Sequence, residues 1–338
     1  MTSAEGRVAA CHGRPLAPAD LQRREAPSPT NNGLRMTLDI RSAESIEARR
    51  LEWLWTDRIP LGAVTILAGD GGLGKSLLTC ELASQLSRGN VAGELQGQPA
   101  PTLILSAEDD AETTIKPRLM ASGADLSLVH IASDIALPGD EHALVEAVQA
   151  RGVRLIVLDP LVAFLGTRVD AHKDQSVRVA LAPLAKLAQE NGLAILAILH
   201  VNRRDTSDSS ARFSGSPAFR NAARSALVFG ADPADPDGRE GPNRVLAQNK
   251  ANLSRPGLRS VACRIESATV EGIDTARIHL GGESTTTADE LVESGRIAAS
   301  QSPADAFLAD ALADGPRDAE IPSGERSRRD ADRHDRGN

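Results

Sequence analysis

The sequence has few aromatic residues: 2% of 338, with two Trp, five Phe and no Tyr. A core must therefore be built mainly from Leu, Ile, Val and Ala, and binding of single strands by base stacking is not supported. Three scattered cysteines without C-x-x-C spacing argue against a disulfide framework and against a zinc site. No apolar run approaches the roughly 18 residues of a membrane span, and no signal-like stretch opens the chain. We expect a reduced, cytoplasmic protein without a membrane partner.

The charge and composition of the chain are those of a globular protein with polar ends. The net charge of −8 excludes a uniformly basic nucleic-acid-binding surface, although not a local basic patch. Residues 1–44 are rich in Pro, Ser, Arg and Asn, and residues 283–338 have a similar composition. These features predict a disordered arm at 1–44, one domain at 45–282, and a mostly disordered tail at 283–338 in which 305–313 forms a short helix.

Between the predicted tails, short apolar runs alternate with helical patterns. The runs predict strands at 63–68, 102–106, 129–132, 153–158 and 193–199, with helices at 75–88, 111–121, 141–151 and 174–190. Four later runs, at 226–229, 244–248, 261–265 and 276–280, predict an added antiparallel edge. This alternation indicates an α/β fold, a mostly parallel sheet flanked by helices.

A glycine-rich segment between the first strand and helix fits the phosphate-binding pattern G-x-x-x-x-G-K-[ST] in full. The residues expected to bind nucleotide are Gly69, Asp70, Gly71, Gly72, Leu73, Gly74, Lys75, Ser76 and Leu77. The free N–H groups at the start of the helix would face the phosphates of ATP. Lys75 would reach the β- and γ-phosphates, and Ser76 would bind Mg²⁺. The pattern also occurs by chance, but here a strand precedes it and a helix follows.

Polar residues end three further strands, where ligands bind in open α/β sheets. Asp159 ends the run LIVLD and is placed to hold Mg²⁺ together with Ser76; alternatively, the strand simply ends at a turn. Glu108 follows the strand at 102–106 and can serve as general base, with Asp109 and Asp110 as helix caps. His200 can sense the γ-phosphate, or it can be a structural histidine bonded to nearby backbone.

Six segments occur together in one order: GDGGLGKS, LILSAEDD, LIVLDPL, AILHVNRR, GSPAFRNAARSALVF and NKANL. From about residue 53 to residue 281 the chain resembles the RecA/DnaB-type ATPases, most closely the plasmid RepA-type hexameric helicase group. The resemblance implies a RecA-like P-loop NTPase core, ATP and Mg²⁺ as ligands, and assembly into a homo-hexamer.

The resemblance also implies roles for single residues. Glu108 matches the catalytic glutamate, Asp159 the Walker B aspartate, and His200 the sensor position. Arg224 resembles an arginine offered to a neighbouring subunit, although it could instead anchor its own helix. Lys250 matches the first residue of a K-x-R pair that points across the subunit interface. The second position of this pair is Asn252, so Arg224 or Arg255 would supply the missing charge, or the finger is weaker.

Loops that face the ring axis in such ATPases would here include residues 163–174 and 201–214. Arg203, Arg204 and Arg212 are the candidates for binding the phosphates of single-stranded DNA. Because Asp205 and Asp208 lie among them, a solvated surface loop is an equal alternative. We expect Mg²⁺-dependent ATP hydrolysis coupled to DNA, in a replicative helicase or loader of a plasmid, phage or mobile element. A KaiC-like switch and, less favoured, a P-loop phosphotransferase are the alternatives.

Overall fold

The computed structural model describes residues 40, 42–133, 135–137, 139–165, 169–170, 173–200, 217–251, 253–255 and 257–300. It divides into two units, Met1–Arg49 and Arg50–Asn338. The described residues of the first unit include a short 3-10 helix, η2 (Ala43–Ser45), which is capped by the Ser42 side chain. Most of the predicted arm at 1–44, and the predicted helix at 305–313, lie outside the described residues.

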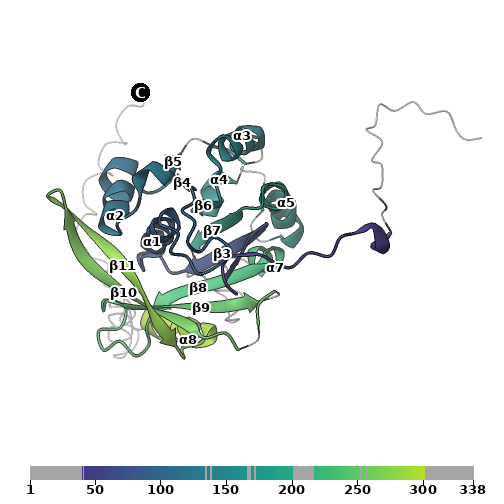
Figure 1. Ribbon diagram of the computed structural model, residues 1–338. Coiled ribbons are helices and arrows are strands. Elements are labelled where there is room, and N and C mark those ends of the chain that lie inside the picture. Colours follow the sequence, from purple (N-terminus) through teal and green to yellow (C-terminus); the bar gives the residue numbers. More distant parts are fainter. Residues whose placement is uncertain are drawn as a thin grey trace, which may run out of the picture. The chain divides into compact units, whose positions relative to one another are not determined.

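A nine-stranded sheet organises the second unit (Figure 1). In spatial order its strands are β11 (Ile273–Ser284), β10 (Ser260–Val270), β9 (Asn243–Ala251), β8 (Ser225–Ala231), β3 (Ala63–Gly69), β7 (Ala194–His200), β6 (Leu155–Asp159), β4 (Thr102–Ser106) and β5 (Val129–Ala132). The strands from β8 to β5 pair in parallel, and those from β8 to β11 pair antiparallel. The predicted α/β fold with an antiparallel edge is confirmed.

One strand of the predicted edge behaves differently. The sequence predicts the run at 226–229 as part of the antiparallel edge, but β8 pairs in parallel with β3 and antiparallel with β9. It is therefore the join between the two parts of the sheet. The reason is its connection: the chain between β7 and β8 includes helix α7 (Pro217–Ala222) and brings β8 back in the direction of β3.

The remaining elements flank the sheet or connect its strands. They are α1 (Lys75–Ser87), the π-helical turn η3 (Ala111–Ile115), α2 (Lys116–Ala121), the 3-10 turn η4 (Leu126–Leu128), α3 (Glu141–Arg151), α4 (Leu161–Phe164), α5 (Asp174–Asn191) and α8 (Ala288–Ser300). Two short strands, β1 (Trp53–Trp55) and β2 (Ile59–Pro60), form a separate hairpin that the sequence patterns did not predict. In the described part of the chain, no helix has the length and apolar character to cross a membrane.

The central parallel strands, from β3 to β4, are buried on both faces, because helices cover both (Figure 1). Successive residues of β7 show this: Leu196 and Ile198 belong to the core under α1 and α2, whereas Ile195 and Leu199 belong to the core under α3 and α5. The two-residue period of a strand sends alternate side chains to opposite faces. A strand that is buried on both faces has a continuous apolar sequence, and the apolar run at 193–199 predicted β7 as a central strand for this reason.

Helical structure continues beyond the predicted domain boundary at residue 282. Thr287 and Glu290 form a capping box, in which Glu290 Oε2 accepts from the Thr287 N–H at 2.6 Å and Thr287 Oγ1 accepts from the Glu290 N–H at 3.2 Å. Helix α8 follows, and its Leu291 packs in a small core with Val228 and Val245. The first part of the predicted tail is thus a helix, because Leu291 finds an apolar surface that composition alone does not reveal.

The two valines of α5 give a matched test of this packing. Val177 is fully buried under the sheet, and Val179 is 68% exposed on the same helix. Val177→Ala should lower the free energy of unfolding by about 2 kcal/mol, because two methyl groups are lost and a cavity remains. Val179→Ala should change it by less than about 0.5 kcal/mol. Urea-induced unfolding measures both, and equal effects would contradict the assigned face of α5.

Candidate nucleotide-binding site

The loop between β3 and α1 has the backbone that close approach of a phosphate requires. Gly72 and Gly74 have φ angles of 76° and 95°, a region that glycine enters without steric cost. A side chain at Gly69 would overlap the carbonyl oxygen of Phe229, so the turn begins with no room for a Cβ. At Gly71 and Gly72 an added Cβ would meet nothing within 4 Å. The loop is therefore supported at its start and open at its centre.

Lys75, the first residue of α1, folds its side chain back over this loop. Its Nζ donates hydrogen bonds to Gly69 O at 2.8 Å and Asp70 O at 2.7 Å, and the residue is 3% exposed. Burial lowers the pKa of the Lys75 ammonium to about 8, against the raising effect of the carboxylates of Asp159, Asp70 and Glu108. Lys75 is thus a buried cation whose N–H groups could donate to a bound anion in place of these two carbonyl oxygens.

Asp159 ends β6 beside the first turn of α1. Its carboxylate is buried and accepts a hydrogen bond from the Ser76 hydroxyl. Burial raises the pKa of the Asp159 carboxyl, and the bond from Ser76 opposes this shift. A carboxylate and a hydroxyl side by side are oxygen ligands of the kind that Mg²⁺ prefers. The described residues contain no group of three or more His, Cys, Asp or Glu able to hold a metal, so Mg²⁺ here would also need phosphate and water oxygens.

Glu108 and His200 meet across the strand ends. Oε2 of Glu108 lies 3.2 Å from Nε2 of His200, with the two side chains 59% and 34% exposed. The same nitrogen is buried without a hydrogen-bond partner in the described part of the chain, so this contact has the distance of an ion pair without good alignment. In the sheet His200 pairs with Gly69, the first P-loop residue. The structure therefore brings Glu108, His200 and the P-loop to one place.

The two aspartates after Glu108 have different roles. Asp110 caps η3, because its Oδ1 accepts from two backbone N–H groups and from the Thr113 hydroxyl. Asp109 is not a cap: its carboxylate pairs with Arg118 at 2.7 Å, and its N–H donates to Ser106 Oγ. The prediction of two caps was wrong for Asp109. Only Asp110 occupies the N-cap position of η3, and Arg118 of α2 pairs with Asp109 instead.

Lys250 lies at the other end of the sheet, against the end of α7. Its Nζ donates to the carbonyl oxygens of Arg220, Asn221 and Ala223, each at 2.9 Å. An ammonium has three N–H donors, and all three are used here within the chain. Burial lowers the Lys250 pKa, and the nearby cations Arg220, Arg224 and Arg178 lower it further. To reach a neighbouring subunit, Lys250 would have to give up all three bonds.

The other basic candidates are placed as follows. Arg224 is exposed just before β8, and its backbone N–H donates to Val64 O at 3.3 Å. Arg255, the alternative source of an interface charge, pairs within the chain with the buried Asp57 at 2.8 Å. The proposed DNA contacts Arg203, Arg204 and Arg212, as well as Asn252, lie outside the described residues.

Two arginines that the sequence patterns did not single out also touch the P-loop. Arg239 pairs with Asp70, and Arg244 donates to Leu73 O. Both come from the connection between β8 and β9 and its junction with β9, about 170 residues after the loop they contact. No local motif links positions so far apart, and residues 232–244 hold four Asp or Glu against two Arg, so the local charge gave no signal either.

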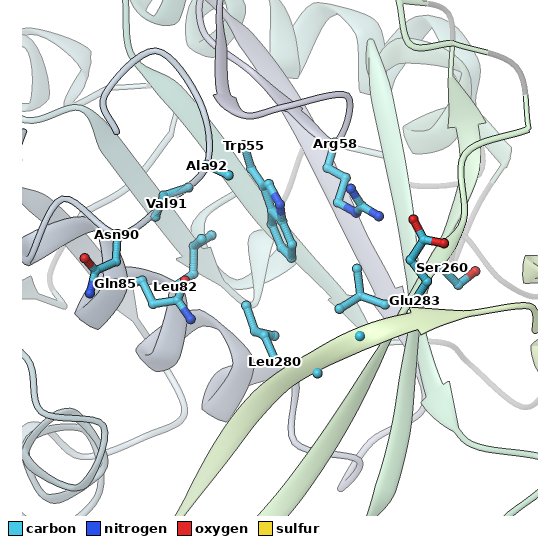
Figure 2. A pocket seen from close by; sticks show the side chains of 13 residues that line it. Trp55, Arg58, Leu82, Gln85, Asn90, Val91, Ala92, Ser260, Leu280 and Glu283 are labelled. Carbon is cyan, nitrogen blue, oxygen red and sulfur yellow. The ribbon is translucent and has the colours of Figure 1, made fainter. Parts of the chain in front are cut away.

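A separate pocket of about 420 Å³ lies beside the second half of α1, whereas the P-loop lies at the start of that helix. Figure 2 shows the Trp55 ring in the middle of the pocket, with Arg58 and Glu283 on one side and Gln85 and Asn90 on the other. The Arg58 guanidinium lies 5.2 Å from the centre of the Trp55 ring, a cation–π distance. None of the predicted site residues lines this pocket.

Comparison with known proteins agrees with this geometry. A family model described as an AAA domain matches residues 29–206. DNA repair protein RadA of Mycobacterium tuberculosis, from strains CDC 1551 / Oshkosh and ATCC 25618 / H37Rv, is 25% identical to the chain over 145 residues. The alignment covers 42% of this chain and 28% of each relative, so the chain spans just over a quarter of their length.

The lowered pKa of Lys75 predicts how nucleotide affinity depends on pH. Phosphate binds the charged ammonium, and a nearby polyanion raises the lysine pKa, so binding takes up a proton above pH 8. Affinity for ATP should be constant below about pH 7 and fall above about pH 8, by at most about tenfold per pH unit. Binding titrations across this range measure the effect. Any ATP affinity that Lys75→Arg retains should not fall with pH in this way, because a guanidinium stays charged. Constant ATP affinity of the parent up to about pH 9.5 would contradict the prediction.

Proposed function

The chain belongs to the AAA domain family, and on this premise we propose that it is a Mg²⁺-dependent ATPase that couples hydrolysis to DNA. One observation carries the proposal: the P-loop, the Ser76–Asp159 pair and the Glu108–His200 pair meet at one edge of a parallel sheet. This edge is where open α/β sheets bind ligands. The groups that would bind the phosphates, hold Mg²⁺ and activate water are then all supplied by one chain.

The residues of the P-loop would bind the triphosphate. Backbone N–H groups at the start of α1 would face the phosphates, as at other helix N-termini. Lys75 would exchange its two carbonyl partners for phosphate oxygens, since an anion attracts the ammonium more strongly than a carbonyl does. Ser76 and Asp159 would hold Mg²⁺, which neutralises charge on the phosphates and orients them when bound.

Glu108 is proposed as the general base. The Glu108 side chain is more than half exposed, so that water can reach its carboxylate. It follows β4, whose last residue pairs with Asp159 at the end of β6. It would accept a proton from the attacking water. His200 contacts Glu108 and pairs in the sheet with Gly69 of the P-loop, and these two contacts support a role in sensing the γ-phosphate. We propose it as a sensor that holds Glu108 in position.

Glu108→Gln tests this role, because it keeps the shape and removes the basic oxygen. Binding of ATP should be retained, and hydrolysis should fall by about 10²–10⁴-fold, the usual size of a general-base contribution. Asp110→Asn is the matched control on the same loop, since asparagine caps helices as well as aspartate does. Its turnover should stay close to that of the parent. Equal losses of binding and turnover in Glu108→Gln would indicate a structural glutamate instead.

The coupling to DNA rests on two supports. The relatives that match this chain are called DNA repair proteins, and the six sequence segments named above resemble those of ring helicases of the RepA type. We propose a homo-hexameric helicase or loader of a plasmid, phage or mobile element, which binds single-stranded DNA through Arg203, Arg204 and Arg212. Non-specific phosphate contacts of this kind need no aromatic platform.

Arg224 is the proposed trans residue of such a ring. It is exposed, and its guanidinium stands among other cations near Lys250, whereas Lys250 itself is occupied by the end of α7. A cation offered by a neighbour would stabilise the charge that develops on the γ-phosphate. Lys250 is therefore proposed to position the α7 end that precedes Arg224, rather than to act as the finger.

ATP turnover with and without single-stranded DNA, measured together with the oligomer mass, tests the function. We expect turnover that depends on Mg²⁺, rises with DNA and occurs in a ring-sized oligomer. Lys75→Ala is the control for contaminating ATPases and should abolish turnover, because the cation on the phosphates is lost. ATP turnover that is the same with and without single-stranded DNA would favour the KaiC-like switch. Consumption of ATP only with a phosphate acceptor would favour the phosphotransferase.

A further inference from the structure

The turn between β4 and η3, which carries Glu108, is fixed by hydrogen bonds on both sides of this residue. Before it, the Ala107 N–H donates to Asp159 O at 3.0 Å, which ties the turn to the end of β6. After it, the Asp109 N–H donates to Ser106 Oγ at 3.1 Å, and the Ser106 hydroxyl donates to Asp109 O at 3.2 Å. The Glu108 side chain is 59% exposed. Its direction therefore depends on the backbone of its neighbours more than on packing of its own side chain.

Arg118 adds a contact to this turn from outside it. Its Nη1 donates to Asp109 Oδ2 at 2.7 Å, a distance typical of a charge-assisted hydrogen bond. The two side chains are 26% and 27% exposed, so the pair is partly shielded from water. Arg118 follows Asp109 by nine residues, and the π-helical turn η3 lies between them. The pair thus joins α2 to the residue that comes directly after Glu108.

The helix that carries Arg118 is itself held in place by packing. Its chain neighbours Pro117 and Leu119 are buried, and Leu119 belongs to the same apolar core as Leu82 of α1. Ile115, the last residue of η3, lies in this core as well. Arg118 is therefore presented to the turn from a fixed support. A side chain anchored in this way can restrict its partner more than a free surface side chain can.

The position of Glu108 matters because a general base must lie within hydrogen-bond reach of the attacking water. A misplacement of about 1 Å can cost about 10²-fold in rate. Loss of the Arg118 guanidinium would remove the support that α2 gives to the Asp109 side chain, next to this base. The P-loop and the Ser76–Asp159 pair would keep their own contacts. The expected defect is therefore in the chemical step and not in nucleotide binding.

We propose that Arg118 is a positioning residue of the catalytic site, which acts through Asp109 to hold Glu108 where it can accept a proton from water. The inference rests on the proposed ATP hydrolysis, and it adds a residue that no sequence motif of the site contains. Arg118 would not itself touch nucleotide or the attacking water. Its removal should lower kcat and leave KM for Mg-ATP nearly unchanged, since the interaction that it supports is made in the transition state.

Steady-state kinetics of ATP hydrolysis test this role. Arg118→Ala should lower kcat by roughly ten- to a hundredfold, the cost of a base misplaced by up to about 1 Å, and should change KM by less than about twofold. Arg118→Lys should keep more of the parent's kcat, because an ammonium can still pair with Asp109, although without the planar fork of a guanidinium. The thermal unfolding temperature should stay close to that of the parent, since a partly exposed ion pair contributes little to stability.

A double variant separates positioning of the base from an independent effect. If Arg118 acts only through Glu108, its loss should matter little once the base is gone. The kcat of Glu108→Gln with Arg118→Ala should therefore stay within about twofold of the kcat of Glu108→Gln alone, whereas independent effects would multiply. Single-turnover measurements with enzyme in excess follow these slow rates, and Lys75→Ala gives the background.

Lys116→Ala is the matched control. Lys116 is the first residue of α2, it carries the same charge as Arg118, and it is exposed. Residues two apart on a helix do not face each other, so the Lys116 side chain leaves α2 on a different side. Its kcat and KM should equal those of the parent. A loss that Lys116→Ala shares would come from the charge of α2 in general and not from the pair with Asp109.

The outcomes separate this inference from the function on which it rests. If the parent hydrolyses ATP no faster than Lys75→Ala, the proposed function fails. If the parent is active and Arg118→Ala is equally active, only the role of Arg118 fails. A rise in KM without a loss of kcat, a loss that multiplies with that of Glu108→Gln, or a loss shared with Lys116→Ala would also overturn that role. A loss confined to kcat, absent in the Glu108→Gln background and smaller in Arg118→Lys, supports it.

Discussion

Parallel pairing of β3, β7, β6 and β4 is the constraint on which the rest of the site depends. It brings Gly69 opposite His200, and Ser106 opposite Asp159, at one edge of the sheet. The alternating apolar side chains that fill both cores fix this register, because a slip of one residue would exchange the two faces of a strand. The polar ends of these strands are therefore brought together beside a core that is mostly apolar, in which Thr65 of β3 and Thr102 of β4 are buried polar residues.

Charge balance links the two buried ionic groups of the site. Burial lowers the pKa of Lys75 to about 8 and raises that of Asp159, so each is shifted towards its neutral form. A triphosphate beside Lys75 and Mg²⁺ beside Asp159 would reverse both shifts, since each supplies an opposite charge at short range. The fold thus carries the cost of two partly desolvated charges that its proposed ligands would compensate. Perturbed pKa values of this kind are common at functional sites.

The antiparallel part of the sheet contributes to the nucleotide site as well as covering an edge. It supplies Arg239 and Arg244 to the P-loop, and the side chain of Ile265 on β10 lies within 3.0 Å of where a Cβ of Gly74 would be. At the opposite end of β9, Lys250 holds the end of α7, which leads into β8. Both ends of β9 therefore fasten segments that flank the parallel strands.

The sequence alone determined the elements whose signals are local. The P-loop pattern, the apolar run of β7 and the Asp at the end of β6 each depend on residues within one short window, and the α/β fold follows from their alternation. Only the tertiary structure decided that β8 runs parallel to β3, that Asp109 pairs with Arg118, and that Lys250 caps α7. It alone joined Arg239 to Asp70, 169 residues apart. These contacts depend on where the folded backbone places distant segments, and residue spacing along the chain carries no record of that placement.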